Sequence, residues 1–222
     1  MALQVHSSIE GVVLAGGQSR RMGQDKAALE IAGQPLLARI VARLHMVVPR
    51  VRVIGPPERA RLVPDVPVIP DVRPGCGALG GIYTALWTTD AAYVLVVGCD
   101  MPFLNVSLLR YLVAVVPGYD AAVLRYGDHT EQLHAIYGQA CLPIIADLIA
   151  AGSLKVSQVF AQVHTRYVDE AEAAQFDPGG LSVMNVNTIA EWQRALGMVK
   201  REECSPAILL PGDKEAGWCR NG

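Results

Sequence analysis

Short runs of consecutive apolar residues alternate with stretches of helically spaced apolar residues along the first half of the chain. The runs are rich in Val, Ile and Leu, have the length of buried strands, and cover residues 12–14, 51–54, 66–69 and 93–97. Helical spacing marks residues 36–44, which Pro35 introduces and Pro49 follows, and residues 79–87. The order strand, helix, strand, strand, helix, strand predicts a mostly parallel sheet covered by helices.

The second half of the chain continues the same mixture of elements. Helices are predicted over residues 107–116, 142–151 and 189–196, and strands over 121–125 and 133–137. Gly152 is placed just after one helix as its C′ glycine, and Thr188 is placed as the N-cap of the last. Without an internal repeat or a linker, the pattern predicts an α/β fold with a single domain over residues 1–200. Residues 201–222 lack a clear period and are expected to be a C-terminal extension of unknown role.

The composition of the 222 residues indicates a packed core, since 51% are hydrophobic and 18% are charged. A formal net charge of −2 argues against a general nucleic-acid-binding protein. No apolar run approaches the roughly 20 residues of a membrane span, and the first ten residues lack the features of a secretory signal. Five cysteines without metal-site spacing fit reduced thiols, so we expect a cytoplasmic protein that binds neither membrane nor nucleic acid.

The segment that follows the first predicted strand is the most informative part of the chain. Residues 14–26 read Leu-Ala-Gly-Gly-Gln-Ser-Arg-Arg-Met-Gly-Gln-Asp-Lys. Adjacent glycines let the backbone turn sharply and approach a ligand, while Arg20, Arg21 and Lys26 supply positive charge. Asp25 is expected either to orient Lys26 or to cap the next turn. Exposed backbone N–H groups beside cations form an anion site, so the segment predicts a polyphosphate ligand.

Two better-known nucleotide motifs do not account for the chain. A Walker A loop ends in Gly-Lys-Ser/Thr, whereas residues 23–27 read Gly-Gln-Asp-Lys-Ala and offer no hydroxyl for magnesium. A Gly-x-Gly-x-x-Gly pattern at residues 75–80, with Asp100 about 20 residues further on, matches the dinucleotide-binding pattern. These glycines, however, come after the third predicted strand and not after the first. Residues 71–74 also separate them from that strand, whereas in a dinucleotide-binding fold the glycines follow their strand directly. A dehydrogenase is therefore disfavoured.

Asp100 is the candidate metal ligand. It comes shortly after the buried run 93–97, and ligands of parallel α/β sheets bind at the carboxyl ends of strands. The glycine loop lies at such an end as well, so the two are expected to meet. A single carboxylate that faces phosphates is a usual way of holding Mg²⁺. The structural alternative is that Asp100 caps the helix after Pro102.

Seven short segments carry a family resemblance when they are taken together and in order. They are 14–17 (Leu-Ala-Gly-Gly), 20–23 (Arg-Arg-Met-Gly), 25–26 (Asp-Lys), 33–36 (Gly-Gln-Pro-Leu), Asp71 with 77–82 (Gly-Ala-Leu-Gly-Gly-Ile), 99–104 (Cys-Asp-Met-Pro-Phe-Leu) and 185–188 (Asn-Val-Asn-Thr). This combination resembles the molybdenum cofactor guanylyltransferases, which belong to the nucleotidyltransferases. The resemblance extends over about residues 11–197.

The resemblance implies a Rossmann-like three-layer nucleotidyltransferase fold with a mostly parallel, mixed sheet. It implies that GMP is transferred from GTP to the terminal phosphate of molybdenum-bearing molybdopterin, with Mg²⁺ as cofactor and pyrophosphate as the second product. Proteins that mature molybdoenzymes are the implied macromolecular partners.

Site residues follow from the resemblance position by position. The implied nucleotide-binding residues are Leu14, Ala15, Gly16, Gly17, Lys26, Asp71 and Asp100. The implied catalytic residues are Lys26, Arg20 and Asp100. Asp100 and Asn185 are the implied metal ligands, with Asn187 as the alternative to Asn185.

Some residues depart from the family pattern, and several alternative functions remain open. Ala78 stands where the family usually has proline, and residues 54–57 read Ile-Gly-Pro-Pro where many members place an asparagine that contacts the nucleotide. Gly16 favours guanine, because relatives that use cytidine mostly have alanine there and a residue without a Cβ lets the backbone approach a larger purine. A molybdopterin cytidylyltransferase, another small-molecule nucleotidyltransferase and a non-catalytic nucleotide-binding module remain as alternatives.

Overall fold

Seven strands form one mixed sheet in the computed structural model, which describes residues 8–17 and 25–204. In spatial order the strands are β5 (Val68–Ile69), β4 (Val51–Ile54), β1 (Ile9–Leu14), β6 (Tyr93–Gly98), β8 (His129–Gly138), β7 (Ala121–Tyr126) and β9 (Thr165–Asp169). Among them β8 runs antiparallel to both of its neighbours, and the other adjacent pairs are parallel. The expected mostly parallel, mixed sheet is therefore confirmed.

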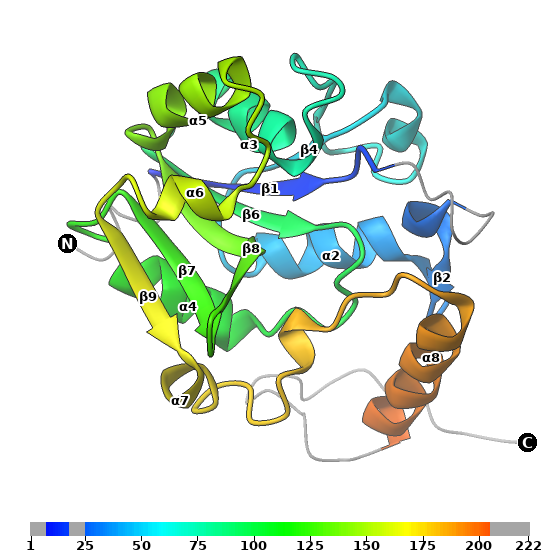
Figure 1. Cartoon of the computed structure of the whole chain (residues 1–222). Coiled ribbons are helices and arrows are strands. Elements are labelled where there is room, and N and C mark those ends of the chain that lie inside the picture. The colour runs from blue at the N-terminus through cyan, green and yellow to red at the C-terminus, as the bar shows by residue number, and fades with distance from the viewer. Residues whose placement is uncertain (1–7, 18–24, 205–222) are drawn as a thin grey trace, which may run out of the picture.

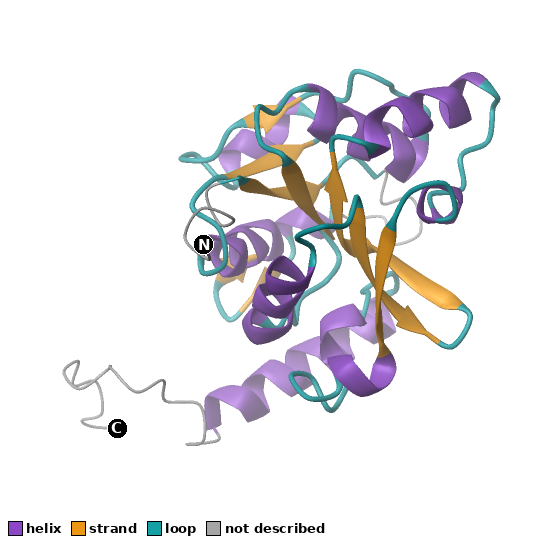
Figure 2. Ribbon diagram, turned by 90° about the vertical axis from the view of Figure 1, so that its left-hand side faces the viewer, coloured by secondary structure: helices purple, strands orange, loops and turns teal. Residues whose placement is uncertain are grey.

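Helices cover both faces of this sheet, which gives three layers (Figure 1). One face carries α2 (Leu36–His45) and α4 (Val106–Val115), and the other carries α3 (Gly77–Trp87), α5 (Cys141–Ala150) and α6 (Ser157–Phe160). Figure 2 shows the helices on either side of the twisted strands. The smaller described elements are η1 (Lys26–Ala28), β2 (Glu30–Ile31), β3 (Gln34–Pro35), η2 (Pro57–Arg61), α7 (Glu170–Ala173), η3 (Leu181–Val183) and α8 (Ile189–Cys204). Within residues 8–17 and 25–204, no helix has the length and apolar character that crossing a membrane requires.

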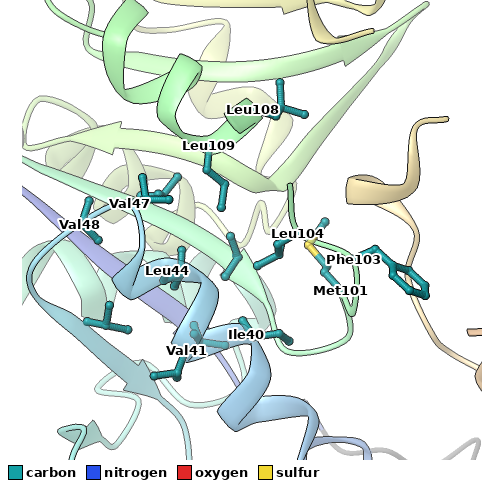
Figure 3. Close-up of a cluster of buried hydrophobic side chains, with 14 of the residues drawn as sticks. Ile40, Val41, Leu44, Val47, Val48, Met101, Phe103, Leu104, Leu108 and Leu109 are labelled. Atoms are coloured by element: carbon teal, nitrogen blue, oxygen red, sulfur yellow. The ribbon is translucent and has the colours of Figure 1, made fainter. Parts of the chain in front are cut away.

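The helix α2 illustrates how the apolar spacing of the sequence builds the core. Its buried residues are Leu36, Leu37, Ile40, Val41 and Leu44, as the spacing predicts. Figure 3 shows Ile40 and Leu44 pointing toward Met101 and Leu104 in the segment after β6, with Leu109 of α4 nearby. Each such side chain contributes about 1.5–3 kcal/mol on burial, so the segment after β6 is firmly anchored on α2.

The central strands end level with one another, and this register positions the site. Leu14 pairs with Ile54 of β4 on one side and with Gly98 of β6 on the other. Ala15 N then donates to Ile54 O at 2.8 Å, and Cys99 N donates to Leu14 O at 3.1 Å. The residues that follow these three strands therefore meet at one edge of the sheet.

Several elements differ from their expected bounds, and one strand of the seven-stranded sheet was not expected. The third predicted strand is reduced to Val68–Ile69, and α8 continues to Cys204, past the boundary expected at residue 200. The unexpected strand, β9, pairs with β7 at the edge of the sheet, and Val168 is its one fully buried residue. A half-exposed edge strand lacks the continuous apolar run that identifies a central strand. Gly152, with φ of +72°, is confirmed as a left-handed residue just after α5.

Candidate active site

A pocket of about 470 Å³ lies at the carboxyl ends of β1, β4 and β6. The glycine loop after β1, the start of α3 and the residues after β6 all contribute to its lining. Of the nucleotide-binding residues expected from the sequence, Leu14, Gly16, Gly17, Asp71 and Asp100 line this pocket. The fold thus brings together residues that are up to 86 positions apart, between Leu14 and Asp100, in the sequence.

Gly16 and Gly17 are exposed at the pocket, and packing does not require either to be glycine. A Cβ added to either residue would meet no atom of the described residues within 4 Å. Neither glycine has the positive φ that disfavours other residues. The missing side chains therefore leave space in the pocket, so a ligand can approach the backbone closely here.

The second glycine pattern shapes the wall made by α3. Gly75 and Gly77 have φ values of +87° and +59°, in the region that favours glycine. A Cβ on Gly80 would lie 2.6 Å from Arg73 O, so glycine is needed there for the turn to pack against the helix. The pattern follows β5 at the edge of the sheet, not the first strand, in disagreement with a dinucleotide-binding unit. It places the N-terminus of α3 at the pocket, where its partial positive charge favours an anion.

Asp71 is held at the same wall by hydrogen bonds to its first carboxylate oxygen. Thr84 Oγ1 donates to Asp71 Oδ1 at 2.7 Å, and Arg73 N donates to the same atom at 2.9 Å. Thr84 Oγ1 in turn accepts from Val72 N at 3.1 Å. The carboxylate is therefore fixed in orientation where it lines the pocket.

Asp100 lies on the pocket lining directly after β6 and Cys99. A Cβ on Gly98 would come within 2.7 Å of Asp100 Oδ1, so the glycine makes room for this carboxylate. Lys26 Nζ is 4.0 Å from Asp100 Oδ2, and the two side chains are 14% and 26% exposed respectively. Burial raises the pKa of Asp100, and the positive charge of Lys26 opposes part of that rise. A half-buried carboxylate of this kind is stabilised by any further positive charge that enters the pocket.

Lys26 is held between Asp100 and the segment that precedes α8. Its Nζ donates to Asn187 Oδ1 at 2.7 Å, and Val186 N donates to Asp100 O at 2.9 Å. The structure therefore brings Asn187 into contact with Lys26, while Asn185 is exposed two residues away. The assignment of Asn185 to a metal stays a prediction, as does the alternative assignment of Asn187.

Asp25 has two contacts, one of which the sequence did not predict. Its Oδ1 accepts from Ala27 N at 3.2 Å and caps η1, which confirms the expected capping role. Its Oδ2 pairs with Nη1 of Arg59, a buried residue of η2 that belongs to none of the sequence motifs. Arg20 and Arg21 lie outside the described residues, so the catalytic role expected of Arg20 stays a prediction.

Cys99 and His134 are not placed for nucleophilic or acid–base chemistry. Burial, with a smaller contribution from the negative charge of Asp100, raises the pKa of Cys99 to about 12, which keeps the thiol protonated. Burial lowers the pKa of His134 to about 4, so the imidazole is neutral at physiological pH. No histidine is among the described residues that line the pocket. The chemistry of the site therefore depends on charge and positioning.

The raised pKa of Asp100 predicts how the stability of the ligand-free protein depends on pH. The folded protein binds a proton at this carboxyl more tightly than the unfolded chain, whose aspartates titrate near pH 3.9 as an approximate value. The ionised carboxylate therefore costs folded-state stability as the pH rises through the raised pKa. We expect Asp100→Asn to unfold at a higher temperature than the wild type, by a margin that grows between about pH 4 and pH 7. Thermal unfolding across that range measures it, and a margin that shrinks as the pH rises would contradict the prediction.

Comparisons with known proteins agree with this geometry. Residues 11–169 match the family model described as the MobA-like NTP transferase domain. A protein of Pelotomaculum thermopropionicum named "Probable molybdenum cofactor guanylyltransferase" is 37% identical over 200 residues, which cover 90% of this chain and 98% of that protein. The molybdenum cofactor guanylyltransferase of Syntrophotalea carbinolica is 33% identical over 186 residues, with 82% and 88% covered.

A solved structure has the same fold. The molybdopterin-guanine dinucleotide biosynthesis protein A of Archaeoglobus fulgidus superposes with a TM-score of 0.75 at 24% identity. The match covers 86% of this chain and 99% of that one. The expected Rossmann-like three-layer fold is therefore confirmed.

Proposed function

Because this chain belongs to the family of MobA-like NTP transferases, we propose that it acts as a molybdenum cofactor guanylyltransferase. It transfers GMP from GTP to the terminal phosphate of molybdenum-bearing molybdopterin. The products are molybdopterin guanine dinucleotide and pyrophosphate. The observation that carries the proposal is the meeting of the glycine loop, Asp100 and Lys26 at the carboxyl ends of three strands.

The described residues supply a binding site for a triphosphate. Backbone N–H groups at Gly16 and Gly17, with the N-terminus of α3, provide donors and partial positive charge at the pocket. Lys26 adds a full positive charge whose position is fixed by its hydrogen bond to Asn187. Arg20 extends this positive charge in the proposed mechanism. These groups together offset the repulsion between two polyanionic substrates.

The donor set beside the phosphates fits a divalent cation, which we propose to be Mg²⁺. Among the described residues, no three His, Cys, Asp or Glu side chains gather into a metal cluster. Of the two carboxylates in the described pocket lining, Asp71 and Asp100, the one beside Lys26 is Asp100, and we propose it as the metal ligand. The side-chain oxygen of Asn185, or that of Asn187, is the proposed second ligand. Mg²⁺ is commonly held in this way, by one or two carboxylates with substrate phosphates and waters. When bound, it neutralises phosphate charge and aligns the displacement.

The transfer needs no general base from the protein. A phosphate monoester has a second pKa of about 6, so the terminal phosphate of molybdopterin is largely dianionic at neutral pH and is already a nucleophile. One of its oxygens forms a bond to the α-phosphorus of GTP, and the bond from that phosphorus to the bridging oxygen of pyrophosphate breaks. Lys26 stabilises the negative charge that develops on the departing pyrophosphate. The lack of histidine among the described lining residues fits this mechanism.

The preference for guanine predicts the effect of Gly16→Ala. Within residues 8–17 and 25–204, a new Cβ would meet no atom within 4 Å, so we expect the fold to tolerate the substitution while the methyl group narrows the pocket. We expect the ratio of kcat/KM for GTP to that for CTP to fall by about 10-fold, since one methylene in a binding pocket commonly changes discrimination by 10-fold or more. Gly197→Ala, on α8, is the matched control, because a Cβ there also meets no atom within 4 Å in the part of the chain that the structure describes. An unchanged ratio of kcat/KM for GTP to that for CTP in Gly16→Ala would show that Gly16 does not determine which nucleotide is selected.

A nucleotide screen with the wild-type protein tests the proposed function. GTP, CTP and ATP are each incubated with Mg²⁺ and molybdenum-bearing molybdopterin, with parallel reactions that lack the acceptor, and pyrophosphate is measured. The proposal predicts release with GTP that depends on the acceptor. Preference for CTP would identify a cytidylyltransferase, and GTP binding without pyrophosphate release would identify a non-catalytic module. We propose in addition that the product passes to proteins that mature molybdoenzymes.

A further inference from the structure

Arg59 contacts both described parts of the glycine-rich segment 14–26, namely residues 14–17 and 25–26. Arg59 itself belongs to none of the sequence motifs. Its Nε donates to Ala15 O at 3.3 Å, and its Nη1 pairs with Asp25 Oδ2. Ala15 precedes Gly16 and Gly17, and Asp25 precedes Lys26. One planar guanidinium therefore contacts the chain next to the loop glycines and also next to the lysine.

The contact at Ala15 completes a tight enclosure of that residue. Ala15 is fully buried, and its N–H donates to Ile54 O at 2.8 Å. A Cβ on Gly55 would lie 3.0 Å from both the C and O atoms of Ala15, so β4 approaches this peptide as closely as glycine permits. With Arg59 on the carbonyl oxygen, the peptide that leads into Gly16 is fixed by the segment after β4.

The contact at Asp25 fixes the other end. Asp25 caps η1 through Ala27 N, and Lys26 is the first residue of η1. Holding the carboxylate of Asp25 therefore fixes the backbone position from which the side chain of Lys26 extends to Asn187 and Asp100. The side chain of Asp25 is 46% exposed, so without a partner it would be free to turn into solvent.

Burial indicates that this contact serves more than stability. Arg59 is 9% exposed, and arginine is rarely buried unless it is paired. Its partner Asp25 is 46% exposed, and an ion pair with a solvent-exposed partner contributes little net stability. Arg59 contacts Ala15, the residue before the pocket-lining Gly16, so it lies next to the pocket lining.

We propose that Arg59 is a positioning residue for GTP, which sets the distance between the backbone N–H groups of Gly16 and Gly17 and the ammonium group of Lys26. The inference rests on the proposed function, since it assigns these groups to the triphosphate. Lysine at position 59 keeps the charge but lacks the planar fork, so it does not reach both Ala15 O and Asp25 Oδ2.

Arg59→Lys, Asp25→Asn and the double variant test the inference. GTP affinity is measured by titration calorimetry without acceptor, alongside kcat, both KM values and the unfolding temperature. We expect Arg59→Lys to weaken GTP binding and raise the GTP KM by about 10-fold, and to leave the acceptor KM unchanged. Asp25→Asn is expected to weaken GTP binding as well. The double variant should bind GTP no more weakly than the single variant with the lower affinity, because both changes break the same link. Arg61→Lys, at an exposed position of the same turn, is the control and should match the wild type.

The outcomes separate this inference from the proposed function. If the wild type binds GTP and Arg59→Lys binds it equally well, Arg59 does not position the nucleotide. If the effects of the two single variants multiply in the double variant, the link through Asp25 is wrong. Should Arg59→Lys fail to fold, Asp25→Asn decides alone, and wild-type affinity in that variant overturns the inference. Failure of the wild type itself to bind GTP would instead overturn the proposed function.

Discussion

Replacing Asp100 by alanine is expected to lower kcat for guanylyl transfer by about 10³-fold. Asp100 is the carboxylate in the described pocket lining that lies within 4.0 Å of Lys26 Nζ. Its removal deprives the proposed Mg²⁺ site of its one carboxylate ligand and leaves the phosphates of two substrates without that neutralising charge. Pyrophosphate release under saturating GTP and Mg²⁺ measures the effect.

The control must separate loss of chemistry from loss of fold. Asp90→Ala removes a carboxylate that is 81% exposed, paired with Arg50 at a position outside the pocket lining, and should leave turnover unchanged. The unfolding temperature of Asp100→Ala should not fall below that of the wild type, because the ionised carboxylate carries a desolvation cost that the substitution removes. Turnover of Asp100→Ala within 10-fold of the wild type, as an approximate limit, would exclude Asp100 as the metal ligand.

Removing the charge of Lys26 while keeping the length of its side chain is expected to lower kcat by about 10²-fold. In Lys26→Met the contacts with Asn187 and Asp100 are lost, and no ammonium group remains to stabilise the departing pyrophosphate. The pH profile of kcat/KM should change as well. Because Lys26 lowers the pKa of Asp100, its loss raises that pKa further, so the acidic limb of the profile moves to higher pH.

A pH profile recorded beside the rate distinguishes two roles for the lysine. Lys155→Ala, an exposed lysine between α5 and α6, is the control and should keep both the rate and the profile of the wild type. A lower rate with an unshifted acidic limb would mean that Lys26 and Asp100 do not interact in the active enzyme. A wild-type rate would exclude Lys26 from transition-state stabilisation.

The central strands and the two glycine loops could be predicted from the sequence because their signals are local. Buried parallel strands appear in the sequence as continuous Val, Ile and Leu runs. The residues that come after β1 include two glycines, and those that come after β6 include a carboxylate. Since parallel strands share one carboxyl edge, the meeting of Gly16 with Asp100 could be inferred without coordinates. The apolar face of α2 was predicted for the same reason.

Other features depend on contacts between distant residues and leave no local signal. Arg59 lies in a polar 3-10 turn, and its contacts with Ala15 and Asp25 arise from the register of β4 beside β1. Asn185 and Asn187 are two residues apart in one motif, so composition cannot tell which of them faces Lys26. The edge strand β9 is half-exposed and mostly polar, and pairing with β7 is what makes it a strand.

The fate of the α-phosphate of GTP tests the account most directly. The wild-type protein is incubated with Mg²⁺, molybdenum-bearing molybdopterin and GTP that is labelled either at its α-phosphate or at its γ-phosphate. The account predicts that the α-label moves into molybdopterin guanine dinucleotide in equal amount to the pyrophosphate formed, and that the γ-label leaves as pyrophosphate. Release of the α-label as free GMP or GDP, or a label that stays in GTP while a parallel reaction with CTP forms pyrophosphate, would contradict it.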